Sequence, residues 1–456
     1  MKSNHLCLRR CFPLAAALLT LASLSLRADD WPQWLGPQRD GVWRETGLLE
    51  KFPAAGLKFR WRTPIGAGYS GPAVAGGRIF VLDRQLAPGA TRPPDPFDKG
   101  TIPGTERVLC LNEADGKVLW KHEYDCPYAV SYPAGPRVTP AVKGGKVYSL
   151  GAEGNLLCLD GATGDVFWSH DFKKDYGIKT PLWGFAGHPL VDGGKLICLV
   201  GGEGSVAVAF DRETGKELWR ALGAKEPGYC PPMIYEFGGK RQLIIWHPES
   251  VNGLDPETGK VYWTYPHTAV RSGMTIPSPR QLGDRLFLTS FYNGSLMLGL
   301  ESGQPALVWQ SRKISEMDTD GLHSVMSTPF LDDGYIYGSC SYGQFRCLKA
   351  DTGERVWETF EPTTGKSVRW GNTFIVKNGN RYFLCNERGD LIIAKLSPEK
   401  YEELSRAHLI DPTNTDPGRP VVWSHPAFAN RSVYARNDKE IVCVSLAAPG
   451  PGADGK

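Results

Sequence analysis

Short apolar segments alternate with polar turns along nearly the whole chain, and one nonapeptide pattern recurs. It is clearest at 211–219 (DRETGKELW) and 255–263 (DPETGKVYW), and 160–168 (DGATGDVFW) keeps the Asp, Thr, Gly and Trp. Glycine accepts the positive φ that a tight turn requires, so each copy predicts a turn followed by a strand that carries a Trp. Because one hairpin cannot bury its own apolar face, the repeat predicts neighbouring units that pack together.

The period of the repeat identifies the architecture. Six tryptophans of the pattern follow one another at intervals of 44 to 51 residues: Trp120, Trp168, Trp219, Trp263, Trp309 and Trp357. This is the length of one four-stranded propeller blade. Each unit holds four short segments rich in Val, Ile, Leu, Tyr and Phe, without the spacing of an amphipathic helix. We therefore expect an all-β propeller of four-stranded antiparallel blades, with these tryptophans packed between neighbouring blades.

The two ends of the repeat region predict how the ring closes. Segment 57–63 (LKFRWRT) is a lone outer strand with Trp61 at the Trp position, whereas 432–436 and 441–446 supply inner strands with no outer one. Closing a ring with strands from both termini removes the open sheet edge. The propeller should therefore span residues 57–446.

The blade count rests on one irregular unit. A seventh blade runs from about 370 to 410, with a strand at 391–396 and a short predicted helix at 398–404 in place of the usual turn. The shared unit formed by the termini is then the eighth. We expect eight blades, with seven as the alternative if the seventh unit is degenerate.

The complete repeat resembles that of a known superfamily. Segment 139–168 reads Thr-Pro-x-Val-x-Gly-Gly-x-Val-Tyr and then Gly-x-Leu-x-Cys-Leu-Asp-x-x-Thr-Gly-x-x-x-Trp. It is similar to the pyrroloquinoline-quinone (PQQ)-like β-propeller repeat of the quinoprotein alcohol dehydrogenase-like superfamily, which also contains the propeller lipoprotein of outer-membrane barrel assembly. The resemblance implies the fold, but one fold hosts catalysts and scaffolds alike.

The N-terminal residues 1–28 have the composition of a signal peptide. Basic residues Lys2, Arg9 and Arg10 precede an apolar run at 14–26 that is too short to span a bilayer comfortably. Neither cysteine in this segment follows a lipobox, which departs from the assembly lipoprotein. We expect an exported, periplasmic or secreted protein without a transmembrane segment, and both Sec and twin-arginine export remain open.

The remaining non-repeat segments receive separate predictions. Residues 29–56, rich in Trp and Pro, should pack on the propeller near its closure, and 447–456 should form a disordered tail. A long Pro- and Gly-rich insertion at 84–106 lies between two strands of the first blade, and it is either functional or solvated.

Charge excludes one class of partner. The predicted signal peptide contains four basic residues and no acidic residue, so the rest of the chain has a net charge of −1 rather than +3. A nearly neutral chain gives no electrostatic reason to expect nucleic-acid binding.

Candidate site residues are sought where the repeats differ, because a feature shared by every blade is structural. The differences fall in the connections before each inner strand, which should gather at one mouth of the central channel. The candidates there are Tyr69, Arg137, Trp183, His188, Tyr229, Arg271, His323, Arg369, Trp370, Asn372 and His425. Arginines and aromatic rings suit an anionic or planar ligand. The same residues could instead plug the channel, and the histidines lack the local spacing of a metal site.

Two functions follow from these residues and the resemblance. The first is a non-catalytic, monomeric binding or scaffold protein of the cell envelope that holds a protein or polysaccharide at the channel mouth. The second is a PQQ- and Ca²⁺-dependent dehydrogenase that oxidises an alcohol or sugar. The sequence contains no adjacent cysteine pair and no CxxCH haem motif, both known among such enzymes. We therefore assign no catalytic residue, no metal and no cofactor, and PQQ with Ca²⁺ belongs only to the second function. The first function is preferred.

Overall fold

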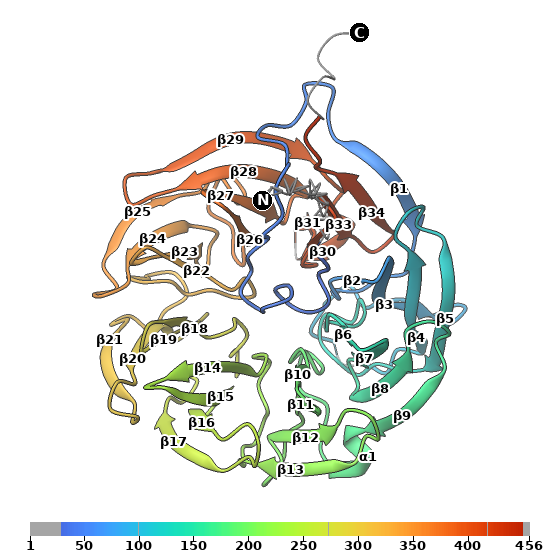
Figure 1. Ribbon diagram of the computed structural model, residues 1–456, viewed down its shortest axis with the longest axis horizontal. Helices are drawn as coiled ribbons and strands as arrows, with labels where there is room; N and C mark the ends of the chain where they lie inside the picture. Colours follow the sequence, from blue (N-terminus) through green and yellow to red (C-terminus); the bar gives the residue numbers. More distant parts are fainter. Residues whose placement is uncertain (1–28, 99, 272, 417, 450–456) are drawn as a thin grey trace, which may run out of the picture.

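The structure is a computed structural model that describes residues 29–98, 100–271, 273–416 and 418–449, so the predicted signal peptide lies outside the described residues. Eight four-stranded antiparallel sheets are arranged as the blades of a ring (Figure 1). The predicted eight-bladed, all-β propeller is therefore confirmed. No helix of the described residues is long and apolar enough to cross a membrane.

The first four blades follow one another around the ring, each running from the channel outward. Their strands are β2 (Ala73–Ala75), β3 (Arg78–Leu86), β4 (Gly104–Asn112) and β5 (Val118–Asp125); β6 (Ala141–Lys143), β7 (Lys146–Leu150), β8 (Asn155–Asp160) and β9 (Val166–Asp171); β10 (Leu190–Asp192), β11 (Lys195–Leu199), β12 (Ala207–Asp211) and β13 (Glu217–Ala221); β14 (Met233–Phe237), β15 (Lys240–His247), β16 (Ser250–Leu254) and β17 (Val261–Pro266).

The last four blades complete the ring. Their strands are β18 (Arg280–Leu282), β19 (Arg285–Ser290), β20 (Gly294–Gly299) and β21 (Ala306–Gln310); β22 (Phe330–Asp332), β23 (Tyr335–Ser339), β24 (Phe345–Lys349) and β25 (Arg355–Thr359); β26 (Thr373–Asn378), β27 (Arg381–Asn386), β28 (Asp390–Leu396) and β29 (Tyr401–His408); β32 (Ala427–Ala429), β33 (Ser432–Arg436), β34 (Glu440–Ser445) and β1 (Lys58–Pro64). A separate hairpin, β30 (Asn414–Asp416) and β31 (Arg419–Val421), and one short helix, α1 (Phe172–Tyr176), lie in the connections.

The repeated turn is built as the nonapeptide predicts. In the second blade, Asp160 Oδ1 accepts hydrogen bonds from the backbone N–H groups of Ala162 at 2.6 Å and Thr163 at 3.0 Å. Gly164 then takes φ +83°, a conformation that residues with a Cβ rarely adopt. These local bonds satisfy the turn without help from a ligand, so the repeated Asp and Thr are structural residues.

The blade tryptophans pack on the next blade. The ring of Trp309 lies so close to the turn of the sixth blade that a Cβ at Gly353 would be 2.6 Å from it, and its Nε1 donates to Ala350 O at 2.7 Å. Six of the seven blade tryptophans contact the next turn, five of them through an Nε1 hydrogen bond and Trp219 through its ring alone: Trp61, Trp120, Trp168, Trp219, Trp309 and Trp357. Trp263 is the exception, because its Nε1 donates to Gln242 of its own blade at 2.7 Å.

The core consists of the apolar layers between blades. Between the second and third blades, for example, Tyr148, Leu156, Leu196 and Val208 are fully buried in one cluster. A fully buried side chain of this kind contributes about 1.5–3 kcal/mol to folding, so each blade depends on its neighbours.

The termini close the ring as predicted. Outer strand β1 pairs antiparallel with β34, with Trp61 opposite Cys443. Residues 447 and 448, which the sequence places in a tail, also belong to the ordered structure, since Ala447 pairs with Leu48. The remainder of the predicted tail, 450–456, lies outside the described residues.

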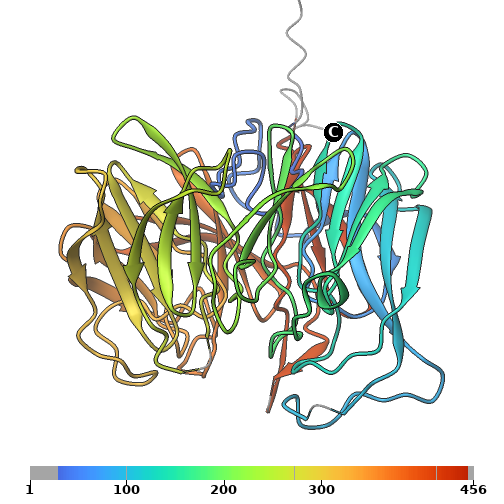
Figure 2. The ribbon, with the colours of Figure 1, turned by 90° about the horizontal axis from the view of Figure 1, so that it is seen from below.

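Residues 29–56 cross the face of the propeller that is formed by the turns carrying the repeat. Trp31 pairs with Val74 in the first blade, and Trp43 N donates to Lys377 O in the seventh at 2.8 Å. In the side view of Figure 2 this blue segment lies near the ring axis, whereas the loop between β3 and β4 extends from the opposite face.

Two predictions about connections are wrong. The helix predicted at 398–404 is a turn followed by strand β29, because the alternating side chains of 401–408 complete the seventh blade against β28. The insertion predicted at 84–106 is shorter, because its ends extend the hairpin: Arg84 pairs with Glu106 in the β3–β4 ladder. Both of these side chains are almost completely buried, so they are not part of a solvated loop.

Candidate functional site

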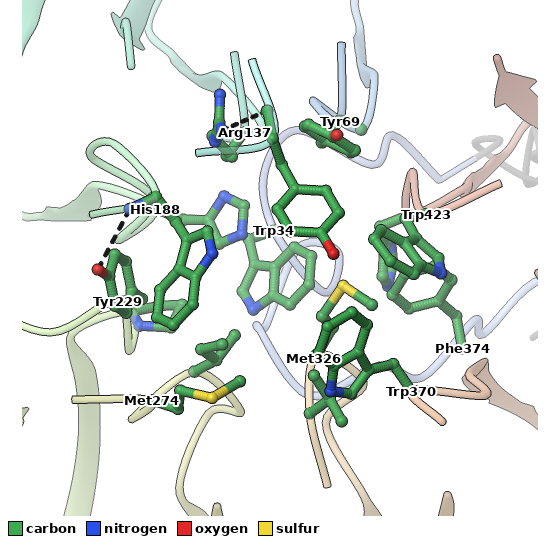
Figure 3. A pocket seen from close by; sticks show the side chains of 18 of the residues that line it. Trp34, Tyr69, Arg137, His188, Tyr229, Met274, Met326, Trp370, Phe374 and Trp423 are labelled. Carbon is green, nitrogen blue, oxygen red and sulfur yellow. Dashed lines mark hydrogen bonds between the residues drawn. The ribbon is translucent and has the colours of Figure 1, made fainter. Parts of the chain in front are cut away.

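A cavity of about 190 Å³, here called the mouth pocket, opens at the channel mouth where the connections to the inner strands converge (Figure 3). Most of its side chains are aromatic or aliphatic. It is lined by Trp34, Tyr69, Gly71, Phe97, Tyr132, Arg137, Trp183, Ala186, His188, Tyr229, Pro231, Met274, Ile276, Val325, Met326, Trp370, Phe374, Trp423 and His425. An apolar concavity with a few polar groups is the usual form of a binding site.

The floor of the mouth pocket is Trp34, which comes from the N-terminal extension on the opposite face. Its ring stacks on His188 with centroids 4.0 Å apart and planes at 12°, and it lies 4.5 Å from the ring of His425. Its Nε1 donates to Ser278 Oγ at 3.1 Å. The extension therefore enters the channel, and Trp34 forms the floor of the pocket.

Arg39 anchors this segment beneath the floor. Its guanidinium donates to the carbonyl oxygens of Pro189 at 3.1 Å and Pro232 at 3.2 Å, which belong to the third and fourth blades. Burial lowers the pKa of Arg39 to about 10, so the side chain stays charged at neutral pH. No carboxylate of the described residues forms an ion pair with it.

The two histidines of the mouth pocket are neutral and oriented. His188 Nδ1 accepts a hydrogen bond from Thr139 N at 2.9 Å, which leaves the proton on Nε2. Burial holds the pKa of His188 well below its ordinary value and lowers that of His425 to about 4. Both rings therefore serve as uncharged flat surfaces at neutral pH.

The rim of the mouth pocket is held by strained aromatic residues. Tyr132 and Trp370 adopt left-handed backbone conformations, with φ of 53° and 62°, and their rings meet edge to face at 6.2 Å. Tyr132 OH donates to Asp416 Oδ1 at 3.1 Å, and Arg419 pairs with the same carboxylate. Such backbone strain costs about 1–3 kcal/mol per residue and gathers at functional sites, which supports a role for this rim.

Arg137 is the one charged side chain of the lining. Its Nη2 donates to the carbonyl oxygens of Ser131 at 2.8 Å and Tyr132 at 2.7 Å, and its Nη1 donates to Gly135 O. The guanidinium also lies 5.2 Å from the centre of the Tyr69 ring. Three carbonyl groups thus fix its position without neutralising its charge.

The structure brings seven of the eleven sequence candidates together around the mouth pocket: Tyr69, Arg137, Trp183, His188, Tyr229, Trp370 and His425. The other four lie elsewhere. Arg271 is exposed beside Tyr292, and Arg369 pairs with Glu316. His323 and Asn372 are buried behind the lining, with 0% and 2% exposure.

Several lining residues are not among the sequence candidates. Trp34 and Phe97 come from the extension and the first-blade insertion, where the repeat gives no register. Tyr132 lies in the early part of its connection, well before inner strand β6. Met274 and Met326 lie in connections that lead to inner strands and Phe374 lies on β26, but Met and Phe are also usual residues of an apolar core. Trp423 lies two residues before the candidate His425, and that proximity in sequence could have indicated its place at the mouth.

The lining does not fit a Ca²⁺-bound quinone. Calcium takes about six to eight oxygen ligands, mainly carboxylates and amides, and none of the side chains around the mouth pocket is Asp, Glu, Asn or Gln. Across the described part of the chain, no three or more His, Cys, Asp or Glu side chains gather closely enough to hold a metal ion. The pocket can therefore bind through aromatic faces and Arg137.

Comparisons with known proteins agree with the fold. The chain is 26% identical over 170 residues to the outer membrane protein assembly factor BamB of Burkholderia pseudomallei. That match covers 36% of this chain and 42% of the relative, so it spans less than half of the curated relative's length.

Solved structures of the same architecture include two classes of protein. BamB from Moraxella catarrhalis matches with a TM-score of 0.56 at 15% identity, over 84% of this chain and 98% of that one. The quinohemoprotein alcohol dehydrogenase of Comamonas testosteroni matches with a TM-score of 0.59 at 15% identity, over 93% and 82%. At this identity these likenesses show the fold alone.

A family profile makes the assignment more specific. The profile described as outer membrane protein assembly factor BamB matches residues 104–359, which is more than half of the chain. The chain therefore belongs to the PQQ-repeat propeller family of the outer membrane protein assembly factor BamB.

Proposed function

We propose that this protein is an exported, non-catalytic binding protein of the cell envelope that holds a partner protein by an apolar group in the mouth pocket. The observation that carries the proposal is a pocket closed at its floor by Trp34 and lined by aromatic and methionine side chains. Burying such a group in a desolvated aromatic pocket is how a binding surface gains most of its energy. Membership of the BamB family and the composition of residues 1–28 support an envelope location.

A protein fits the mouth pocket better than a polysaccharide. Sugar hydroxyls need polar partners, and several polar groups of the lining are already engaged. His188 Nδ1 accepts from Thr139 N, Tyr132 OH donates to Asp416, and Trp423 Nε1 donates to Glu387 at 3.2 Å. An apolar side chain needs none of these groups, so it can enter without breaking a hydrogen bond.

The proposal is tested with a neutral probe and a pair of methionine variants. The purified protein is titrated with N-acetyl-L-phenylalaninamide, and binding is followed by tryptophan fluorescence, because four tryptophans line the mouth pocket. Met326→Glu puts a charge into the pocket and should abolish saturable binding. Met317→Glu is the matched control, since Met317 is 71% exposed and lies outside the lining.

The possible outcomes separate the proposal from its rivals. Saturable binding that survives in Met317→Glu and disappears in Met326→Glu supports the proposal. Absence of binding by the unmodified protein, or equal loss in both variants, contradicts it. Binding of a soluble glucan oligosaccharide in place of the amide would assign the pocket to polysaccharide. The expected monomer is checked by sedimentation of the same samples.

A further inference from the structure

Two arginines at the mouth pocket form no ion pair with a carboxylate of the described residues. Arg137 at the rim and Arg39 below the floor bond to carbonyl oxygens, and neither forms an ion pair within the described residues. These two guanidinium groups therefore place positive charge at the rim and beneath the floor of an apolar cavity.

Three acidic groups on connections near the rim are already paired. Asp416 and Glu387 both form ion pairs with Arg419, which lies on β31. Glu316, on the neighbouring connection, pairs with Arg369 at 2.6 Å. Asp416 and Glu387 share one arginine, so these pairs together carry one net negative charge, but none of the three carboxylates contacts Arg137. A low-dielectric wall strengthens the attraction of the Arg137 guanidinium for an anion that touches it.

Arg137 is also prepared to donate. Its three bonds to the carbonyl oxygens of Ser131, Tyr132 and Gly135 use Nη1 and Nη2 and leave Nε–H without a protein acceptor in the described part of the chain. The same bonds fix the plane of the guanidinium at the rim, where Figure 3 shows it beside Tyr69 and above His188. A planar, fixed guanidinium is suited to a carboxylate.

The pocket beneath Arg137 is shaped for a ring. Trp34 lies at its centre in Figure 3, and Trp370 and Trp423 lie on the other side of the cavity from Tyr229. Aromatic rings gain energy by stacking or by edge-to-face contact with such walls, and a volume of about 190 Å³ suits a group of modest size.

We infer that the ligand of the mouth pocket is an aromatic ring joined to a carboxylate, with the ring against Trp34 and the carboxylate on Arg137. This inference rests on the proposed function and makes it more specific. The chemistry is found both at the C-terminal residue of a polypeptide and in a free aromatic acid. It explains why an apolar pocket keeps an arginine that has no acidic partner.

The test compares two ligands that differ only in charge. N-acetyl-L-phenylalanine and N-acetyl-L-phenylalaninamide are titrated against the unmodified protein at low ionic strength, with binding followed by tryptophan fluorescence and confirmed by calorimetry. A hydrogen bond to a charged group predicts that the acid binds at least about tenfold more tightly than the amide. Added salt should reduce this ratio, because it screens the attraction to Arg137.

Variants assign the effect to Arg137. In Arg137→Met the acid should bind no better than the amide, whereas Arg137→Lys should keep part of the preference. Arg271→Met is the matched control, because Arg271 is an exposed arginine of the β17–β18 connection and lies outside the lining. The ratio in the unmodified protein decides the inference even if Arg137→Met fails to fold.

Two more ligands separate the sources of the carboxylate. Tighter binding of the peptide acetyl-Ala-Ala-Phe with a free C-terminus assigns the site to a chain end, and tighter binding of 3-phenylpropionate assigns it to a free acid. Either result upholds the chemistry. If the amide binds as tightly as the acid, the inference is overturned while the proposed function stands. If neither binds, the proposed function also fails.

Discussion

The packing of each tryptophan on the next blade predicts a large difference between two identical substitutions. Gly353 and Gly303 both lie in the turn before the outer strand of neighbouring blades, with φ of 71° and 77°, although the turn at Gly303 is two residues longer. A Cβ at Gly353 would lie 2.6 Å from the Trp309 ring, whereas a Cβ at Gly303 would meet nothing within 4 Å, and Trp263 Nε1 donates within its own blade. Gly353→Ala should therefore destabilise the protein much more than Gly303→Ala.

The magnitude follows from the contacts that each change disturbs. Both alanines must adopt a left-handed backbone, which costs about 1–2 kcal/mol. Gly353→Ala must also displace the Trp309 ring, with an overpacking cost of about 1–3 kcal/mol, and lose the bond from Trp309 Nε1 to Ala350 O, worth about 1 kcal/mol. The difference between the two variants should be about 2–4 kcal/mol.

Equilibrium unfolding in urea measures this difference, with circular dichroism and tryptophan fluorescence followed on the same samples. The comparison uses midpoints and slopes of both variants under one condition, so errors of extrapolation to zero urea largely cancel. Equal destabilisation of the two variants would refute the argument. It would mean that the turn glycines are required by their backbone conformation alone and that the tryptophan contact contributes little.

Three further predictions concern the mouth pocket and its floor. Burial lowers the pKa of His425 to about 4, so between about pH 6.5 and 4 this histidine is protonated in the unfolded chain but neutral in the folded one. The free energy of unfolding should therefore fall by up to about 3 kcal/mol as the pH drops through this window. His425→Asn should flatten this part of the plot of urea midpoint against pH, whereas the same change at the exposed His408 should not. Trp34→Ala should lower the free energy of unfolding by about 3–5 kcal/mol and abolish binding of the aromatic probes, and unchanged binding would show that Trp34 is not the floor. PQQ with Ca²⁺ should give no saturable shift of Tm, because the lining offers no carboxylate or amide; a shift that needs both additions would contradict this assignment of the pocket.

The repeat could be predicted from sequence because the same local sequence signals recur in each blade. The Asp–Gly turn, the alternation of apolar residues and the Trp that follows are all encoded within about ten residues, so they mark every blade independently of its neighbours. The closure of the ring by both termini could also be predicted, since Trp61 stands at a Trp position with no inner strands before it. The seventh blade misled the sequence argument because Pro398 and the charged residues 399–403 favour a helix locally, whereas pairing with β28 decides the strand.

The mouth pocket was only partly predictable, for a physical reason. Seven lining residues come from connections that the repeat places at one mouth, so register alone brings them together. Trp34 and Phe97 come from segments outside the repeat, and Tyr132 comes from the early part of the β5–β6 connection, so long-range packing decides their positions. Trp34, for instance, reaches His188 across 154 positions of sequence. No periodic pattern could indicate such a contact.

This division of labour explains how one propeller can serve different functions. The blades bury their apolar residues against one another, and the polar groups of the repeated turns bond within each turn. The ring itself therefore exposes few groups that could bind a ligand. Binding chemistry must then come from segments that the ring does not need for closure. Here the N-terminal extension supplies the floor through Trp34, the first-blade insertion supplies Phe97, and the β5–β6 connection supplies Tyr132 and Arg137. A family member with a different N-terminal extension would keep the fold and lose this pocket, so similarity of the ring alone should not be used to transfer a ligand between propellers.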